Sequence, residues 1–326
     1  MNEITTTAAP TTALATSPSE NPAAMYLGGL RGAVGTFAGS QRTQLHGLNR
    51  VARMLAGDDA TALSIDWASI SPAVLAAIRA RLVEESAPAT VNRLQSAMKG
   101  VLKAAWQLGR IDADTRDRCL DVLKAVKSRR EPSGRHMDDE ELETLFGVIS
   151  TDTSPAGARD GAIIALMNAL GLRRSEVAGL DLADIDRTSW RIVVRGKGWA
   201  ERVLYATNGC RAALEDWIAI RGEADGALFC PIRKGGHLVV GRGISPTTVS
   251  EVMRYRTAAA GIENARPHDL RRTFAGSLLT AGVDVVTVAA LMGHASPTTT
   301  ARYDRRPDEL KSKACEAVSI PYRRRA

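Results

Sequence analysis

The sequence predicts a mainly α-helical protein of two units, with one small antiparallel β-sheet in the second unit. Three observations predict this fold class. Apolar residues recur at helical spacing along most of the chain, a basic stretch with Pro and Gly separates two such regions, and β-rich residues form one pair of runs about a Gly-Lys-Gly turn. The 326 residues, 44% of them hydrophobic, are sufficient for a core in each unit.

The first 24 residues are rich in Thr, Ala, Ser and Pro and have no apolar periodicity. We therefore expect a disordered leader over residues 1–24. The chain has no basic-then-apolar signal pattern, and no apolar run approaches the roughly 20 residues that span a bilayer. These features predict a cytoplasmic protein.

The first unit, residues 25–127, reads as entirely helical. Leu45, Leu48 and Leu55 form one apolar stripe, Ser71-Pro72 is a typical helix start, and a further helix is expected over about 113–126. Between them, a long helix places basic residues among its apolar ones. The apolar positions are Val91, Leu94, Met98, Val101, Leu102 and Ala105, and the basic ones are Arg93, Lys99 and Lys103.

A basic linker is expected at residues 128–136. The stretch KSRREPSGRH carries four fixed positive charges, including Arg129 and Arg130, which suit it to crossing a phosphate backbone. Residues 25–136 hold 17 Lys and Arg against 10 Asp and Glu, whereas residues 137–326 hold 26 against 24. This excess in the first half indicates a polyanionic partner. The alternative is that the linker is only a solvated tether.

The second unit is expected over residues 137–320, followed by a basic tail at 321–326. It opens with the helix-start signal MDDEELETLF, and SWRIVVRGKGWAERVLYA predicts the hairpin. The remaining helices are expected at about 157–171, 208–221, 245–260, 267–281, 284–293 and 306–316.

Neither a metal nor a cofactor is predicted. Cys119, Cys210, Cys230 and Cys315 lie far apart, with no CxxC pair and no Cys/His spacing of a metal site. We interpret them as buried small apolar residues.

The stretch HDLRRTFAG concentrates charge at the start of a helix. In a helix over 267–281, His268, Arg271 and Arg272 fall within about 100° of one another, beside an apolar stripe that includes Phe274 and Leu278. His268 and Arg271 thus lie where the helix leaves the core, near its N-terminus, where an anion is the fitting ligand. Taken alone, the charges also fit an ordinary surface.

Four further residues in this unit could join His268 and Arg271 in one site, although each of them also has a simpler structural interpretation. Arg173 in GLRRSE follows a helix end, but it could pair with Glu176. Lys197 lies at the hairpin tip, but it could be a solvated turn residue. His294 in LMGH could cap a helix C-terminus, and Tyr303 could be a core aromatic.

Together these residues match metal-free attack of a phenol on a phosphodiester. Arginines stabilise the charge on the non-bridging oxygens of the transition state. A lysine protonates the leaving oxygen, and the tyrosine hydroxyl is the nucleophile.

The motifs GLRRSEVAGL, RGKG, PHDLRRTFA and LMGHASPTTTARY, in this order, resemble the tyrosine recombinase/phage integrase family. The resemblance spans about residues 25–320. It implies the tyrosine recombinase fold, with a helical SAM-like core-binding domain that binds DNA and a mostly helical catalytic domain. It also implies a site-specific DNA recombinase that uses a 3′-phosphotyrosyl intermediate and needs neither metal nor ATP.

The resemblance implies a role for each matching residue. Arg173 and Arg271 clamp the scissile phosphate, and Lys197 is the general acid. His268 takes the base-like position, His294 is a further phosphate ligand, and Tyr303 is the nucleophile. Arg272 falls outside this set and is assigned to a DNA backbone contact or a salt bridge. The residues assigned to DNA binding on the first unit and linker are Arg93, Lys99, Lys103, Arg129 and Arg130.

The family also implies partners: double-stranded DNA with short core sites, and a homotetramer coupled by exchange of the C-terminal helix. A DNA-acting protein of this kind is expected at the nucleoid. The leader leaves no room for the arm-binding domain of lambda-type integrases, which favours an Xer-like enzyme.

Two alternatives remain open at this point. The region around Gly282 resembles a helix-turn-helix, which fits a non-catalytic DNA-binding regulator. A type IB topoisomerase would share the chemistry but would relax supercoils without a defined sequence.

Overall fold

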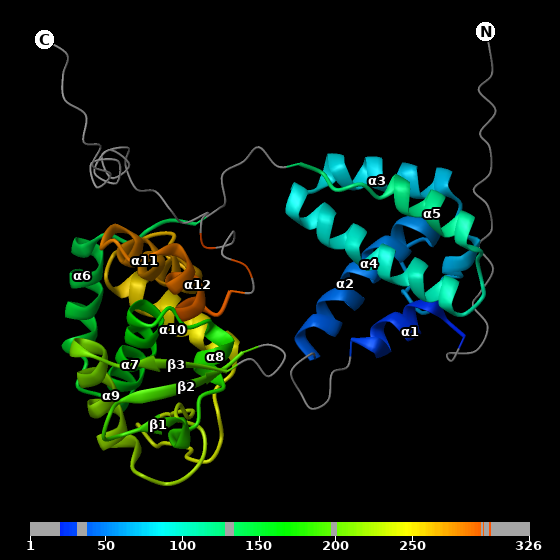
Figure 1. Ribbon diagram of the computed structural model, residues 1–326. Helices are drawn as coiled ribbons and strands as arrows, with labels where there is room; N and C mark the ends of the chain where they lie inside the picture. The colour runs from blue at the N-terminus through cyan, green and yellow to red at the C-terminus, as the bar shows by residue number, and fades with distance from the viewer. Residues whose placement is uncertain are drawn as a thin grey trace, which may run out of the picture. The chain divides into compact units, whose positions relative to one another are not determined.

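The computed structural model describes residues 20–30, 38–127, 134–196, 201–294, 296 and 300. The chain divides into two units, Met1–Glu131 and Pro132–Ala326. The predicted fold class is confirmed, because both units are mainly helical and the second contains a three-stranded antiparallel sheet (Figure 1). No helix within the described ranges is long and apolar enough to cross a membrane.

The first unit is built around one long central helix. Its elements are α1 (Pro22–Gly29), α2 (Ala38–Ala56), a 3₁₀ turn (Trp67–Ser69), α3 (Pro72–Glu85), α4 (Pro88–Gln107) and α5 (Ala113–Val122). Helix α4 packs against the other four helices. Its predicted apolar positions, Val91, Leu94, Met98, Val101, Leu102 and Ala105, are all buried.

Two glycines let the helices of this unit approach closely. A Cβ atom at Gly100 of α4 would lie 2.1 Å from the Tyr26 ring of α1, and one at Gly47 of α2 would lie 2.8 Å from Leu94. Helix α1 was not predicted. It begins at Pro22, capped by Asn21, inside the stretch assigned to the leader. The rest of the leader, residues 1–19, lies outside the described residues.

The second unit begins with α6 (Asp139–Ser150), α7 (Pro155–Ala169) and α8 (Arg174–Ala178), followed by a 3₁₀ turn (Leu182–Asp184). The sheet has β1 (Ile185–Asp186), β2 (Arg191–Arg195) and β3 (Glu201–Tyr205). Four helices complete the unit: α9 (Asn208–Arg221), α10 (Pro246–Ala259), α11 (Pro267–Thr280) and α12 (Val285–Met292).

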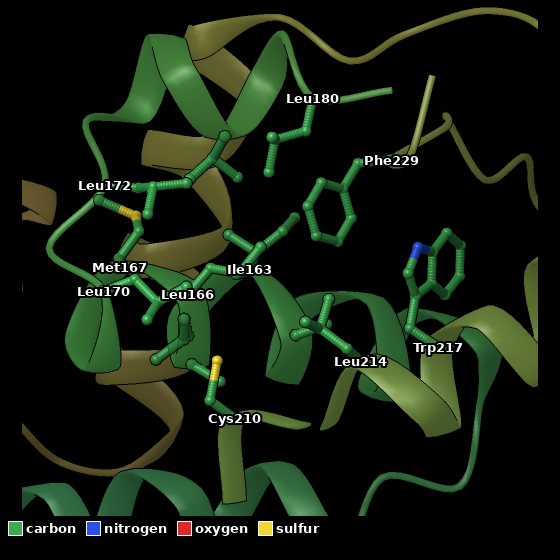
Figure 2. Close-up of a cluster of buried hydrophobic side chains, with 14 of the residues drawn as sticks. Ile163, Leu166, Met167, Leu170, Leu172, Leu180, Cys210, Leu214, Trp217 and Phe229 are labelled. Atoms are coloured by element: carbon green, nitrogen blue, oxygen red, sulfur yellow. The ribbon is translucent and has the colours of Figure 1, made fainter. Parts of the chain in front are cut away.

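The core of the second unit surrounds α7, which packs against α6, α9, α10 and α11. Figure 2 shows Ile163, Leu166 and Met167 of α7 among side chains of α9 and the following loop. There the Trp217 ring stacks on Phe229, and its indole N–H donates to the carbonyl of Leu228 at 2.9 Å.

A buried ion network fixes α10 to α7. Arg256 of α10 is 4% exposed, and its guanidinium binds Asp160 at 2.9 Å and Asp152 at 2.7 Å. Arg159 binds the other oxygen of Asp160 at 2.8 Å. A buried charge is tolerated only when it is paired, so removing one partner of this network would be strongly destabilising.

The predicted hairpin is confirmed by the pairing of β2 with β3, in which Arg195 lies opposite Glu201. Strand β1 adds to its edge and was not predicted, because two residues carry no readable alternation. Cys119, Cys210 and Cys230 are buried, as predicted, and burial raises the pKa of the Cys210 thiol to about 12. The helix expected at 306–316, Cys315 and the tail at 321–326 lie outside the described residues.

Candidate active site

Arg271 forms the centre of the site. It lies on α11, one turn from the helix start, and is 1% exposed. One guanidinium nitrogen donates to the carbonyl of Gly171, at the end of α7, and the other to the carbonyl of Met292, at the end of α12. A single fixed charge therefore connects the ends of two helices that are far apart in the sequence.

Arg173 approaches the same point from α8. It is the residue before the first helical position, and its guanidinium donates to Gly293 O at 3.0 Å and to Glu176 Oε1 at 2.7 Å. The ion pair with Glu176, considered above as an alternative, is thus present, and it coexists with placement in the site. The Arg173 side chain remains 40% exposed, so it can reach a ligand.

His294 follows directly on the end of α12. Gly293 ends the helix at φ 60°, and the His294 N–H donates to Ala289 O at 3.0 Å, so the backbone closes the helix as predicted for a cap. The imidazole Nδ1 lies 2.7 Å from Thr300 Oγ1. Both the capping role and the position in the cluster therefore apply to this residue.

Partial burial and the neighbouring arginine charges lower the pKa of both histidines in the cluster. Partial burial, followed by the charges of Arg271 and Arg173, lowers the pKa of His294 to about 4. The pKa of His268 is also lowered, first by loss of water from around part of the ring and then by Arg272 and Arg271, although the residue retains an exposed surface. The fixed positive charge of the site is therefore that of the arginines, which favours an anionic ligand.

A cavity of about 1230 Å³ opens beside these residues, between α8, α10 and α11. Arg173, His268 and Arg271 line it, together with the further basic side chains Arg174 and Arg254. These basic side chains therefore share one cavity with apolar residues such as Met167, Leu172 and Ile262.

The structure brings together four of the six predicted catalytic residues: Arg173, His268, Arg271 and His294. Lys197 belongs to the connection between β2 and β3, and it lies outside the described residues. Tyr303 also lies outside them. Their contacts with the cluster stay predictions.

Arg272 is not among the residues that line the cavity, and it holds the chain that enters this unit. Its guanidinium donates to Gly134 O at 3.0 Å. On the same face of α11, Asp269 accepts from the Arg135 N–H at 3.0 Å and Thr273 Oγ1 from the Met137 N–H at 2.9 Å. Arg272 thus has an intramolecular role, and a DNA contact by it stays a prediction.

The basic residues predicted on the first unit lie on α4. Arg93 and Lys99 are half-buried and Lys103 is exposed, and the Arg93 guanidinium donates to Thr43 O at 3.3 Å. Arg129 and Arg130 of the linker lie outside the described residues.

Two further residues, Glu176 and Arg202, contact the cluster and were not predicted as part of it. Glu176 is 7% exposed and accepts hydrogen bonds from both Arg173 and Arg202. Its burial alone would raise its pKa, but the hydrogen bonds from Arg202 and Arg173 outweigh that effect and lower it. Spacing could have indicated Glu176, because a carboxylate three residues after a helix start caps the backbone. No sequence signal marks Arg202.

Comparison with known proteins gives a consistent result. The model of the phage integrase family matches residues 135–309. The tyrosine recombinase XerC of Pseudomonas aeruginosa (strain LESB58) is 33% identical over 246 residues, which cover 73% of this chain and 76% of that protein. XerC of Corynebacterium efficiens is 31% identical over 227 residues, covering 68% and 69%.

Solved structures share the fold at low identity. The Tn1549 transposon integrase in complex with transposon right end DNA matches with a TM-score of 0.63 at 19% identity, covering 91% of this chain and 99% of that one. A lambda integrase (75–356) dimer bound to a COC′ core site also gives 0.63, at 16% identity, covering 84% and 91%.

Proposed function

The chain belongs to the phage integrase family and is a tyrosine-type site-specific recombinase, and from its site we propose how it cleaves and rejoins DNA. The carrying observation is the convergence of Arg173 and Arg271 on the carbonyls at the end of α12, directly before His294 and beside a cavity with further basic side chains. That arrangement suits a phosphodiester of double-stranded DNA.

The two arginines hold the scissile phosphate. Carbonyls at both ends fix the Arg271 guanidinium, so its charge needs no reorganisation when negative charge develops on the non-bridging oxygens. Arg173, more exposed, adds a second guanidinium with planar N–H donors. His294 is neutral in the free protein, so it acts as a hydrogen-bonding ligand of the phosphate.

Tyr303 and Lys197 carry out the covalent step. The Tyr303 oxygen attacks phosphorus as His268 accepts its proton, and the bond from phosphorus to the 5′-oxygen breaks. Lys197 protonates that oxygen, which leaves a 5′-hydroxyl and a 3′-phosphotyrosyl bond. Attack by a 5′-hydroxyl reverses the step, and because one phosphodiester replaces another, no external energy source is required.

The two units have different roles, one in DNA binding and one in catalysis. Residues 25–127 form the core-binding DNA-binding domain, with Arg93, Lys99 and Lys103 on its central helix, and residues 137–320 form the catalytic domain. The linker at 128–136 follows the DNA backbone through Arg129 and Arg130, with the residues before the Asn21 cap of α1 as a leader and 321–326 as a basic tail. We further propose short core sites, a homotetramer coupled by its C-terminal helices, and action at the nucleoid.

A covalent capture experiment tests this function. The protein is incubated with duplexes that carry a nick within a randomised core, then denatured, and DNA that stays attached to protein is recovered and sequenced. Wild-type protein should enrich a defined core sequence as an adduct, and the Tyr303→Phe variant should form none. An adduct that persists in Tyr303→Phe would place the nucleophile elsewhere, and no adduct with wild-type protein would refute the enzymatic proposal.

A further inference from the structure

We propose that Arg202 is a positioning residue that holds Arg173 and the end of α12 in one arrangement. The inference rests on the proposed function, because it concerns the placement of phosphate-binding groups. Arg202 lies on β3, one residue after the Glu201 that pairs with Arg195, and it is separate from the residues assigned to the phosphate.

The hydrogen bonds of Arg202 close a ring. Its two terminal nitrogens donate to Glu176, at 3.0 Å to Oε1 and 2.8 Å to Oε2, and its Nε donates to Leu291 O at 2.8 Å. Glu176 in turn binds Arg173, and Arg173 donates to Gly293 O at 3.0 Å. The ring thus runs from β3 through α8 to the end of α12 and returns to β3.

Burial makes this ring stiff. The side chains of Arg202 and Glu176 are 12% and 5% exposed, so water competes little for their hydrogen bonds. One carboxylate serves two guanidinium groups, and the loss of either arginine leaves it with fewer donors inside the protein. Breaking a buried pair by removing one partner is costly, so neither Arg173 nor α12 moves without disturbing Glu176.

The backbone of α12 is shaped to receive Arg202. Gly293 has φ 60°, and a Cβ atom there would lie 2.9 Å from the Arg202 Nη1. A side chain at position 293 would therefore displace the guanidinium as well as strain the backbone. The charge of Arg202 is also near enough to contribute to the lowered pKa of His294, the residue that follows.

Lysine cannot replace Arg202 in this role. The guanidinium uses its terminal nitrogens for both carboxylate oxygens and its Nε for a carbonyl on another element, all in one plane. A lysine ammonium keeps the charge but has no such fork, so it would bind Glu176 or Leu291 O without fixing the angle between them.

The test measures the single-turnover rate of adduct formation, with protein saturating, on a core duplex enriched by the capture experiment. The variants are Arg202→Met and Arg202→Lys. The matched control is Arg221→Met: Arg221 is 4% exposed in the same unit, and its guanidinium donates to carbonyls within residues 222–227, away from the site. DNA affinity and the unfolding temperature are measured for each protein.

We expect both Arg202 variants to lose about a hundredfold in rate, the loss typical of a group displaced by about 1 Å, while DNA affinity changes little. Arg221→Met should be destabilised but should cleave at the wild-type rate at temperatures where it is folded. The double variant Arg173→Ala/Arg202→Met should be slower than Arg173→Ala by a smaller factor than Arg202→Met alone is slower than wild type, because Arg202 acts partly through Arg173 and partly through the end of α12.

A rate in Arg202→Lys equal to that of wild type, or fully multiplicative losses in the double variant, would overturn the inference. So would a parallel loss of rate in Arg221→Met, since that would attribute the effect to stability alone. If Arg202→Met does not fold, Arg202→Lys decides the matter. Absence of an adduct with wild-type protein is the separate outcome that refutes the proposed function.

Discussion

Replacing Gly171 with alanine tests how closely the end of α7 and α11 are fitted around Arg271. Gly171 has φ 60°, a left-handed conformation that costs a residue with a Cβ about 1–2 kcal/mol. Its carbonyl accepts a hydrogen bond from Arg271. The new Cβ would lie 2.4 Å from Cδ1 of Phe274, three residues after Arg271 on α11.

The contact with Phe274 adds a second cost. The ring must retreat by roughly 1 Å to reach a normal carbon–carbon separation of about 3.5 Å, and overpacking of this kind typically costs about 1–3 kcal/mol. The free energy of unfolding of the second unit should therefore fall by about 2–5 kcal/mol. Gly109 provides the matched control, because its φ is 68° and a Cβ there meets nothing within 4 Å. Gly109→Ala should lower the free energy of unfolding of the first unit only by the cost of the left-handed backbone, about 1–2 kcal/mol.

Native-state hydrogen exchange measured by mass spectrometry suits this comparison, because it reports on each unit separately and does not assume a single unfolding transition. Gly171→Ala should reduce the protection of amides in α7 and α11 and leave the first unit unchanged. Gly109→Ala should affect the first unit alone. Adduct formation should fall in Gly171→Ala, because the shifted ring and carbonyl displace Arg271. An equal loss of unfolding free energy in the two variants would refute the reasoning, because backbone strain at the glycine position would then account for the whole effect.

Five further predictions concern the site and the assembly. Arg173→Ala should slow adduct formation by about 2–3 orders of magnitude, the loss typical of removing one oxyanion contact, with DNA binding mostly retained in a gel-shift assay. Arg271→Ala should lose as much rate and, because two carbonyls depend on Arg271, stability as well; a mild effect of either would argue against the phosphate clamp. Lys197→Ala should regain cleavage on a substrate with a 5′-thiolate leaving group, and no rescue would assign the acid elsewhere. Deleting residues 307–326 should abolish cooperative assembly in sedimentation but leave single-site binding, and unchanged assembly would contradict this. An NMR titration should find the pKa of His294 at about 4. The unfolded chain takes up that proton near pH 6.5, so the free energy of unfolding should fall as pH decreases from 6.5 towards 4; a midpoint near the ordinary value would contradict the charge environment described.

Periodicity predicted the framework of the site. The spacing in this helix predicted an apolar stripe with Phe274 and Leu278 beside the charged residues at the start of α11. Phe274 is buried, and Leu278 is partly buried against the same cluster. Helix bounds in the second unit agree to within two residues for α7, α9 and α11. Such agreement is expected where apolar spacing and Pro or Ser start signals coincide.

Short elements escaped prediction for a physical reason. Helix α8 has five residues and β1 has two, so neither is long enough for its period of about 3.6 or 2 residues to repeat. The missed α1 begins in a Pro- and Ala-rich stretch whose composition resembles that of an unstructured leader, and its burial depends on packing against α4.

The sequence by itself predicted the residues that we propose for the chemistry, among them two arginines and two histidines, and it predicted the helix that bears His268 and Arg271. Only the tertiary structure decided which of these side chains form ion pairs and hydrogen bonds with one another. Glu176 binds its i−3 neighbour Arg173 and also Arg202, 26 residues away on a strand, and Arg271 joins carbonyls at positions 171 and 292. Local spacing determines the face of a helix on which a side chain lies. The hydrogen-bond partner of a long charged side chain is set only when packing brings distant backbone close to it and excludes the water that would compete.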